Sequence, residues 1–333
     1  MRTPRTLPLR IGAAAALVVA ATGLAACGTT DDSGGTSSDA KAITITDARG
    51  KKVTLDGPAT RVAGTEWNVI EYLASLGVQP VGVSDIKGFT QWDSAVTLDK
   101  DAKDIGTRGE PSLDTLATLD LDVLFVTDQL VGDSLKQIEK SIPVIVVPGG
   151  DAEDPTGQML ENVDLVAKAT GTEDEAAKLK QQFEAKLAET KQDVAESDLA
   201  GAPVALNDAY AEGSTVSVRP YMPGSQLGDL LKQVGFENAW SSIKGLKGDP
   251  VYGLAATDVE GLTKLPEDTQ FWYTGNEEST PDIYTETLKD NKVWTSLPFA
   301  DDAVALPPRI WMFGGPLSMI QFLEQVDAIV AKA

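Results

Sequence analysis

Three arginines stand out because the chain otherwise draws most of its positive charge from lysine. Arg108, Arg219 and Arg309 each lie in a loop just before or after a predicted helix or strand. A guanidinium presents a planar set of N–H donors to oxygen-rich ligands and stays charged when partly buried. These arginines are therefore candidates for binding an oxygen-rich ligand. The alternative is that each forms an ordinary surface ion pair.

Aromatic side chains gather in the same loops or open the neighbouring helices. A ring offers a large apolar contact area with a polar edge, which suits a bulky, partly apolar ligand. By contrast, Trp240 and Trp272 adjoin predicted helices or strands, so we expect them in the core. The candidate ligand-binding aromatic residues are Trp67, Trp92, Tyr221, Tyr252, Trp311 and Phe313.

The composition excludes several kinds of chemistry. The chain has no histidine and a single cysteine, Cys27, so Ser-His-Asp or Cys-His catalysis, imidazole metal sites and disulfides within the chain are excluded. The formal net charge of −22 repels nucleic acid, and it becomes more negative once the three leader arginines are removed. An extracellular hydrolase that uses paired acids remains an alternative, although neither G-x-S-x-G nor a P-loop motif occurs.

The N-terminus predicts export. Arg2, Arg5 and Arg10 precede an apolar run at 11–24, and small residues follow, which is the pattern of a signal peptide over residues 1–26. The sequence Leu-Ala-Ala before Cys27 resembles the lipobox of bacterial lipoproteins, which implies that Cys27 is lipidated. The alternative is a cleaved leader with a free thiol. Residues 27–41 are rich in Gly, Ser, Thr and Asp, so we expect a flexible tether.

Two stretches alternate strands with helices, which predicts an α/β fold with two lobes and mostly parallel sheets. The predicted N-terminal lobe, 42–171, has a hairpin at 42–47 and 51–55, strands at 61–63, 78–83, 123–126 and 144–147, and helices at 67–76, 113–119, 132–140 and 158–169. The predicted C-terminal lobe, 201–333, has strands at 204–206, 215–218, 270–273 and 303–306, and helices at 226–234, 259–265 and 316–331.

One uninterrupted helix is predicted between the lobes, over residues 172–200. Thr172 and Glu175 form a capping-box pattern, and apolar residues recur at intervals of three or four. No glycine or proline occurs before Gly201. The helix therefore predicts a long connection between two lobes, although an ordinary surface helix has the same pattern.

A short sequence pattern occurs in both predicted lobes. Its members Leu116, Leu119, Asp122 and Phe125 recur, with a constant offset of 146 residues, as Leu262, Leu265, Asp268 and Phe271. The same offset pairs Asp114 with Glu260, each at the start of a predicted helix. This indicates two related lobes, unless the similarity is a coincidence.

Several dispersed motifs together resemble the bacterial ferric siderophore-binding proteins of ABC importers, nearest to the ferric hydroxamate (ferrichrome) branch. The resemblance extends from about Arg61 to Ala328. Its motifs are Arg61-Val-Ala-Gly-Thr-Glu66-Trp67, Leu76-Gly-Val-Gln-Pro-Val-Gly-Val83, Asp104-Ile-Gly-Thr-Arg108-Gly-Glu-Pro-Ser-Leu113, Met222-Pro-Gly-Ser225, Glu237-Asn-Ala-Trp240 and Ile310-Trp-Met-Phe-Gly-Gly-Pro-Leu-Ser318.

The resemblance implies a class III substrate-binding protein fold: two Rossmann-like lobes joined by one long helix, with the ligand in a shallow cleft between them. It implies no cofactor, since ferric iron is held by the siderophore. It also implies an ABC permease with a cytoplasmic ATPase as partner, and a monomer anchored by lipid at the outer face of the cytoplasmic membrane. A cobalamin or haem receptor of the same fold is the alternative ligand class.

Residue roles follow from the resemblance. It implies that Arg108 hydrogen-bonds the oxygens around iron and that Asp114 and Glu260 dock onto permease arginines, unless these two acids only stabilise helix starts. Arg219 and Arg309 have no clear counterpart in the ferrichrome branch, which leaves a catecholate or carboxylate siderophore open. The aromatic positions that match are Trp92, Tyr252, which replaces a family tryptophan, Trp311, and Phe313, which lacks the hydroxyl of a family tyrosine. Another family tyrosine is absent near Leu130.

Overall fold

The computed structural model describes residues 41–128, 135–213, 215–274 and 281–333. The predicted signal peptide, Cys27, all of the tether except Lys41, and Leu130 lie outside the described residues. Within these ranges, no helix combines the length and the apolar character that crossing a membrane requires.

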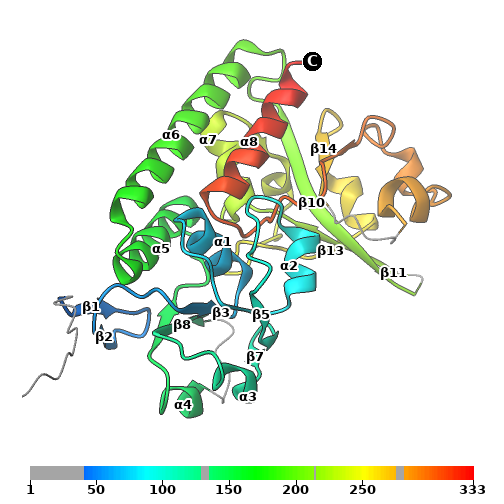
Figure 1. The fold of residues 1–333 in the computed structure, drawn as a ribbon. Helices are drawn as coiled ribbons and strands as arrows, with labels where there is room; N and C mark the ends of the chain where they lie inside the picture. The colour runs from blue at the N-terminus through cyan, green and yellow to red at the C-terminus, as the bar shows by residue number, and fades with distance from the viewer. Residues whose placement is uncertain (1–40, 129–134, 214, 275–280) are drawn as a thin grey trace, which may run out of the picture. The chain divides into compact units, whose positions relative to one another are not determined.

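The N-terminal lobe is built on a five-stranded, all-parallel sheet in the order β5-β4-β3-β8-β9 (Figure 1). Its strands are β3 (Val62–Gly64), β4 (Gly82–Val83), β5 (Lys103–Asp104), β8 (Val123–Thr127) and β9 (Val144–Val147). Two antiparallel pairs accompany it, β1 (Ile43–Thr46) with β2 (Lys52–Leu55) and β6 (Gly106–Thr107) with β7 (Glu110–Pro111). The hairpin predicted at the start of the lobe is confirmed. The strand predicted at 78–83 is limited to its last two residues.

Helices cover both faces of this sheet. They are α1 (Trp67–Ser75), α2 (Ile86–Trp92), α3 (Leu113–Leu116), α4 (Leu135–Ile138) and α5 (Pro155–Thr170). Helix α5 starts before its predicted residue because Asp154 caps Gly157 and Pro155 occupies the first turn. Helix α3 is shorter than predicted, although Ser112 caps it by accepting a hydrogen bond from the backbone N–H of Thr115.

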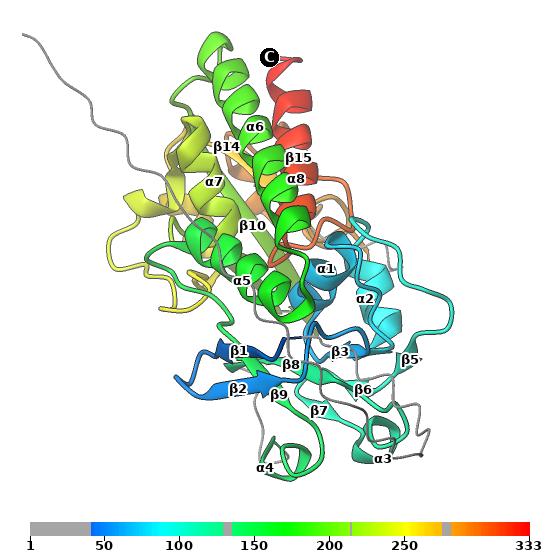
Figure 2. The same cartoon turned by 60° about the vertical axis from the view of Figure 1, so that its left-hand side comes forward.

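Helix α6 (Glu173–Glu196) connects the two lobes and lies alongside α8 (Pro316–Val330) (Figures 1 and 2). The predicted capping box is wrong: the Thr172 side chain caps no helical N–H, and its hydroxyl is hydrogen-bonded to that of Thr170 instead. Acidic residues at 173–175 still place negative charge at the positive end of the helix dipole. The helix ends where Ser197 takes an extended backbone conformation.

The C-terminal lobe has a mixed sheet in the order β13-β11-β10-β14-β15, with β12 also paired to β10. The strands are β10 (Pro203–Glu212), β11 (Thr215–Pro220), β12 (Glu237–Asn238), β13 (Thr257–Asp258), β14 (Gln270–Tyr273) and β15 (Val304–Ala305). The helices are α7 (Gln226–Val234), α8, the 3₁₀ turns η2 (Ala239–Ser242), η3 (Glu260–Lys264) and η5 (Trp294–Ser296), and the π-helical turn η4 (Ile283–Thr287). The helix predicted at 259–265 is therefore a 3₁₀ turn.

The two lobes share one hydrophobic core. Alternate strand residues point to opposite faces, so Phe125 of β8 and Trp272 of β14 both reach the layer of helices α1, α5, α6, α7 and α8. Their neighbours Leu124 and Phe271 face away, into separate outer cores. The described residues accordingly belong to one compact unit. A core that extends through both lobes restricts how far they can separate.

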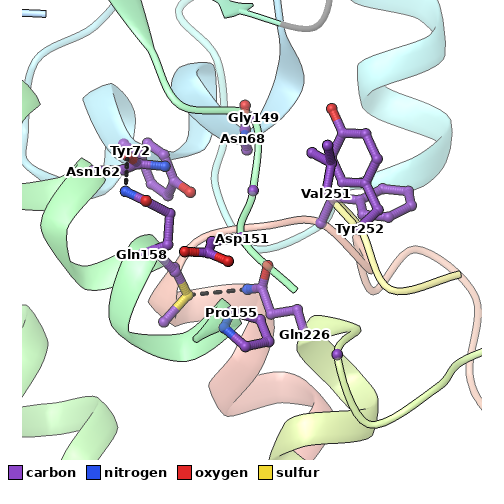
Figure 3. Close-up of a pocket in the computed structure, with 14 residues that line it drawn as sticks. Asn68, Tyr72, Gly149, Asp151, Pro155, Gln158, Asn162, Gln226, Val251 and Tyr252 are labelled. Carbon is purple, nitrogen blue, oxygen red and sulfur yellow. Dashed lines mark hydrogen bonds between the residues drawn. The ribbon is translucent and has the colours of Figure 1, made fainter. Parts of the chain in front are cut away.

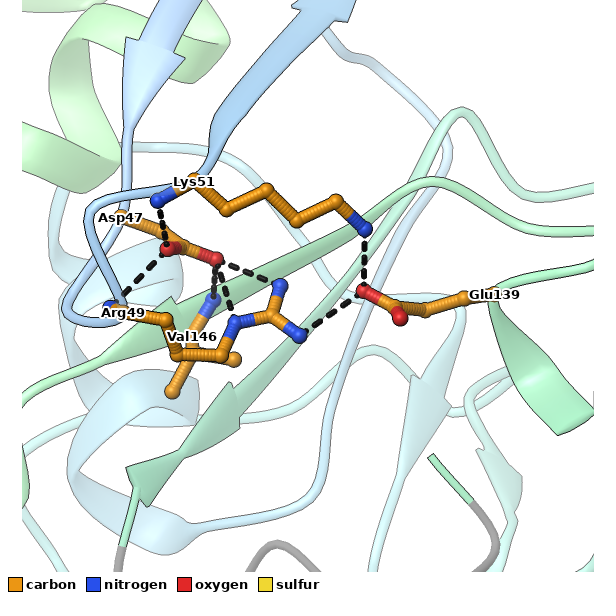
Figure 4. A network of polar contacts seen from close by, with 5 residues as sticks. All are labelled: Asp47, Arg49, Lys51, Glu139 and Val146. Atoms are coloured by element: carbon orange, nitrogen blue, oxygen red, sulfur yellow. Dashed lines mark hydrogen bonds and ion pairs between the residues drawn. The ribbon is translucent and has the colours of Figure 1, made fainter. Parts of the chain in front are cut away.

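The first hairpin is fastened to the sheet by a polar network (Figure 4). Asp47 accepts hydrogen bonds from the Arg49 side chain and from the backbone N–H of Val146 in β9, and Arg49 and Lys51 both pair with Glu139. Burial of Asp47 opposes its ionisation, but these hydrogen bonds prevail and lower its pKa. The network therefore closes one edge of the lobe, away from the cleft residues described below.

The repeated pattern is reproduced only in part. Leu116 and Leu262 both lie in the outer core of their own lobe. In the strands, residues 146 apart do not take equivalent positions: Phe125 faces the shared core, whereas Phe271 faces the outer core of its lobe. The two lobes thus have related layers without residue-for-residue equivalence.

Candidate functional site

A pocket opens between α1 and α5 of the N-terminal lobe and the loops of the C-terminal lobe (Figure 3). About 360 Å³ of empty space lies between its lining residues, a volume that includes space open to solvent. Amide and carboxylate groups line one side and Tyr252 the other. Its polar lining residues include Asn68, Asp151, Gln158, Asn162 and Gln226.

Next to the pocket, five aromatic rings form a continuous surface that we call the aromatic wall: Trp67, Trp92, Trp311, Phe313 and Tyr252. Trp311 lies at its centre, with ring centroids 4.8 Å from Trp67, 6.0 Å from Trp92 and 5.1 Å from Phe313. Phe313 then contacts Tyr252 at 5.2 Å, and both rings line the pocket. The contacts are edge-to-face, the geometry that the ring quadrupole favours. Both lobes therefore contribute rings to one aromatic cluster, in which Trp67 and Trp311 are buried and Trp92, Phe313 and Tyr252 are partly exposed.

Arg108 lies over this wall. Its guanidinium carbon is 4.2 Å from the Trp67 ring centroid and 5.5 Å from that of Trp311, which are cation–π distances. The side chain projects from the turn between β6 and β7, where Gly109 has a φ of 81° that glycine adopts easily. Of the three candidate arginines, Arg108 is the one that the structure places on the aromatic wall.

The guanidinium of Arg108 is already paired. Its Nε lies 2.8 Å from Oε1 of Glu66, and its Nη2 donates to Oε2 at 3.1 Å. Glu66 also caps α1 by accepting a hydrogen bond from the backbone N–H of Trp67. Burial raises the pKa of Glu66, while the charge of Arg108 opposes this shift. Glu66 was part of a recognised motif, but sequence reasoning gave it no role.

The pKa of Tyr252 depends on the charged groups around the pocket. Burial raises the pKa of Tyr252 to about 12, the nearby carboxylates of Glu66, Asp128 and Asp249 add to the shift, and Arg108 opposes it. The acidic groups around this phenol therefore outweigh its cationic neighbour.

Arg219 and Tyr221 lie elsewhere than predicted, behind the wall. Tyr221 is fully buried and its hydroxyl contacts Sδ of Met312. Arg219 forms a bidentate ion pair with Asp208 and lies 3.7 Å from the same sulfur. Arg219 of β11 lies directly opposite Asp208 of β10, so their side chains share one face of the sheet and form this pair. Tyr221 cannot touch a ligand in this conformation, and both side chains support the loop that carries Trp311.

Arg309 contributes to the contact between lobes through its backbone. Its carbonyl accepts hydrogen bonds from the backbone N–H and the hydroxyl of Ser94, both at 3.0 Å. Arg309 has a φ of 67°, an uncommon conformation for a residue other than glycine. Its guanidinium makes no ion pair with any side chain that the structure describes.

A buried carboxylate joins the lobes below the wall. Glu71 of α1 accepts hydrogen bonds from the backbone N–H groups of Gly315 (2.7 Å) and Ser318 (2.9 Å) and from the Ser318 hydroxyl (2.7 Å). It thus caps α8, which has no cap of its own. Asp93 is hydrogen-bonded to Glu71, and burial together with the charge of Glu71 raises the pKa of Asp93 to about 9. Burial raises the pKa of Glu71 as well, so the carboxyl pair retains a proton well above the ordinary pKa of either residue.

The two predicted docking acids are exposed, one in each lobe. Asp114 lies in the first turn of α3, and Glu260 begins η3. Their exposure is compatible with docking and equally with simple helix-start acids, so their role stays a prediction.

Sequence reasoning missed the amides of the pocket. Gln158 donates to Asn162 at 3.1 Å, and Gln226 of α7 donates to the carbonyl of Gly314 at 2.8 Å. Gln158 and Asn162 share one face of α5, which a spacing of four residues could have indicated. Gln226 gave no such signal, because its position depends on how α7 packs against the loop at Gly314.

A family model described as periplasmic binding protein matches residues 62–301. The Fe(3+)-citrate-binding protein YfmC of Bacillus subtilis is 24% identical over 246 residues, which are 74% of this chain and 72% of that protein. The iron(3+)-hydroxamate-binding protein FhuD of Escherichia coli is 22% identical over 275 residues, or 82% and 88% of the two chains.

A similar fold occurs in the crystal structure of the Fe3+-Desferal-bound siderophore-binding protein FhuD from Vibrio cholerae. The TM-score is 0.67 at 24% sequence identity, and the alignment covers 81% of this chain and 97% of the other. This confirms the predicted fold class, with two α/β lobes and one long connecting helix.

Proposed function

Because its residues 62–301 match the family model, the chain belongs to the periplasmic binding protein family, and we propose that it captures a ferric siderophore outside the cytoplasmic membrane and passes it to an ABC permease. One observation carries this proposal: Arg108 lies on an aromatic wall to which both lobes contribute, beside an open pocket. Relatives named for binding ferric hydroxamate and ferric citrate support the same ligand class.

The wall and its arginine suit a ligand that is large, oxygen-rich and partly apolar. The siderophore's own oxygens hold the iron, so the protein needs to recognise only the outside of the complex. The N–H groups of Arg108 that Glu66 leaves free can donate to ligand oxygens. The Trp311 indole N–H is buried and has no hydrogen-bond partner among the described residues, so it could donate to a ligand only after a movement that exposes it. No bond is made or broken in this function.

Closure around the ligand should be small. The shared core and the hydrogen bonds from Glu71 to α8 connect the lobes below the pocket. A tilt of the loops at Tyr252 and Trp311 requires less repacking than a wide hinge motion. The alternative, a large rotation of one lobe, would break the cap of α8.

Fluorescence titration of the purified chain without its leader tests the binding function. We expect the aromatic wall to make tryptophan emission fall on addition of a ferric hydroxamate, catecholate or carboxylate siderophore, and to change much less with the iron-free compounds. No response to any of the three ferric classes would refute the function.

Delivery is proposed to use Asp114 and Glu260 as the contacts with permease arginines. The double variant Asp114→Ala, Glu260→Ala should bind the ferric siderophore normally and import it poorly, as measured by uptake of radioactive iron into cells. Glu184→Ala, which removes an exposed acid of α6, is the matched control. Normal uptake by the double variant would contradict the docking role.

Lipid attachment at Cys27 is proposed to hold the protein at the outer face of the cytoplasmic membrane. The leader pattern supports it, and labelling of cells with a radioactive fatty acid measures it. We expect label in the natural protein and none in Cys27→Ser.

A further inference from the structure

Glu66 lies deeper in the site than the arginine it pairs with. The Glu66 side chain is 7% exposed and that of Arg108 is 32% exposed, and the two are joined by one hydrogen bond, from Nη2 to Oε2, and by an ion-pair contact of 2.8 Å between Nε and Oε1. This ion pair is held more firmly than a surface pair, because the carboxylate is nearly buried and its attraction to the guanidinium is little screened by water. The positive charge that faces the pocket is therefore compensated before any ligand arrives.

The pair cannot separate easily. Glu66 is fixed by its hydrogen bond from the N–H of Trp67, and the guanidinium lies against the rings of Trp67 and Trp311. Freeing Arg108 would leave a nearly buried carboxylate without its cation, which is costly. We therefore expect the pair to persist when the ligand binds, with Arg108 donating hydrogen bonds outward through its remaining N–H groups.

Other charges near the pocket do not restore a positive field. None of the described residues that line it is lysine or arginine, and Asp151 is among them. Arg219, which the sequence offered as a second cation, is paired with Asp208. Arg309, the third candidate arginine, contacts Ser94 through its backbone carbonyl, and its side chain is not among those that line the pocket. The pocket is thus close to neutral or weakly acidic.

The charge of a ferric siderophore depends on its chelating groups. Hydroxamates are singly negative, so three of them balance a ferric ion and the complex is neutral. Catecholates are doubly negative, so three of them leave a strongly anionic complex. A site with donors but no net positive charge favours the neutral complex, since charge complementarity sets specificity more than affinity.

From this geometry we propose that Glu66 is a specificity-determining residue: by neutralising Arg108 it makes the pocket accept ferric complexes of little net charge and discriminate against strongly anionic ones. This inference rests on the proposed function and narrows it to the hydroxamate class. Glu66 acts through Arg108 and does not itself contact the ligand.

Replacing Glu66 by glutamine removes the compensating charge and retains the shape of the side chain and an acceptor for the N–H of Trp67. We would titrate the natural protein and Glu66→Gln with ferrichrome, a neutral ferric trihydroxamate, and with ferric bacillibactin, an anionic ferric triscatecholate. We expect the preference for ferrichrome to fall by ~10-fold or more in Glu66→Gln, mainly through tighter binding of the anionic complex. That gain should shrink as salt is raised.

Two further variants keep the test decisive. Glu184→Gln, an exposed position on α6, changes the net charge equally and should leave the preference unchanged. The double variant Glu66→Gln, Arg108→Gln has no charge at this site, so its preference should return toward that of the natural protein even if its affinity is lower. Melting temperatures of all variants check that each one is folded.

The outcomes separate the two claims. If the natural protein binds neither complex, nor a ferric carboxylate, the proposed function fails. If it binds a ferric siderophore but Glu66→Gln shifts both affinities equally, or if the natural protein already prefers the triscatecholate, the function stands and the role of Glu66 is wrong.

Discussion

Helix α1 carries two buried glutamates whose surroundings differ. Glu66, at its N-terminal end, pairs with the guanidinium of Arg108 and faces the aromatic wall. Glu71, in its middle, is paired with backbone N–H groups of α8 and with Asp93. The sequence of the helix alone does not distinguish them, because both are acidic residues within an otherwise apolar segment.

The two glutamates differ in how many hydrogen-bond donors their partners keep free. A guanidinium has five N–H donors, so Arg108 can satisfy Glu66 and still present donors to a ligand. The N–H groups of Gly315 and Ser318 donate to Glu71, and none of these three residues is among those that line the pocket. The first carboxylate therefore adjusts recognition, and the second holds the lobes together.

The largest effect should come from Glu71→Ala. The substitution leaves the first N–H groups of α8 and the Asp93 carboxyl buried without their partner, and losing one member of a buried polar network costs ~3–5 kcal/mol. We expect the free energy of unfolding in urea to fall by about that amount. Glu66→Gln, which keeps its acceptor, should lose much less stability. Similar losses for the two variants would remove the distinction between the glutamates.

Arg108→Ala should have the next largest effect, on ligand binding, and it should also lower stability because Glu66 loses its cation. Loss of a charge-assisted hydrogen-bond donor and of its stacking on Trp67 should weaken ferric hydroxamate binding by ~10–100-fold. Fluorescence titration measures it. Arg219→Ala is the comparison variant: because that arginine pairs with the nearly buried Asp208 behind the wall, we expect it to lower the free energy of unfolding and to weaken binding less than Arg108→Ala does. Equal losses would mean that Arg219 also reaches the ligand.

Much of the fold could be predicted from local patterns. Strands β8, β9 and β14 and helices α1, α7 and α8 have the periodicity and end signals that sequence reasoning uses, and their predicted bounds agree to within one residue. Short pieces could not be predicted. Helix α3 and the 3₁₀ turn η3 share one sequence pattern, but packing against different sheets decides their form.

The positions of Arg108 and the aromatic residues could be predicted from the family resemblance. The ion pairs and hydrogen bonds between distant residues could not. Arg108 and the five rings of the aromatic wall do lie together, although whether they bind a ligand stays a prediction. Tyr221 was misplaced because its hydroxyl contacts Met312, 91 residues away in the chain, a contact that no local pattern indicates. Glu66 and Glu71 depend on partners 42 and 244 residues away in the chain, a separation that no local pattern encodes.

The last prediction concerns the proton shared by Asp93 and Glu71. It tests whether the contact of Glu71 with α8 depends on pH in a way that the ion pair of Glu66 with Arg108 does not. The pKa of Asp93 is raised from 3.8 to about 9, since burial and the charge of Glu71 disfavour its ionised form. In the unfolded chain this carboxyl loses its proton near its ordinary value, whereas the folded protein retains it. The stability that the shared proton provides is therefore complete below about pH 4 and is lost progressively as the pH rises toward 9.

Asp93→Asn removes this dependence, because the amide can donate to Glu71 at any pH. We expect the free energy of unfolding of the natural protein to fall, relative to that of the variant, as the pH rises from 5 to 9. Melting temperatures measured at pH 5, 7 and 9 provide the comparison. If the two proteins change in parallel across this range, Glu71 and Asp93 do not share a proton, and the hydrogen bonds to α8 alone must explain how Glu71 differs from Glu66.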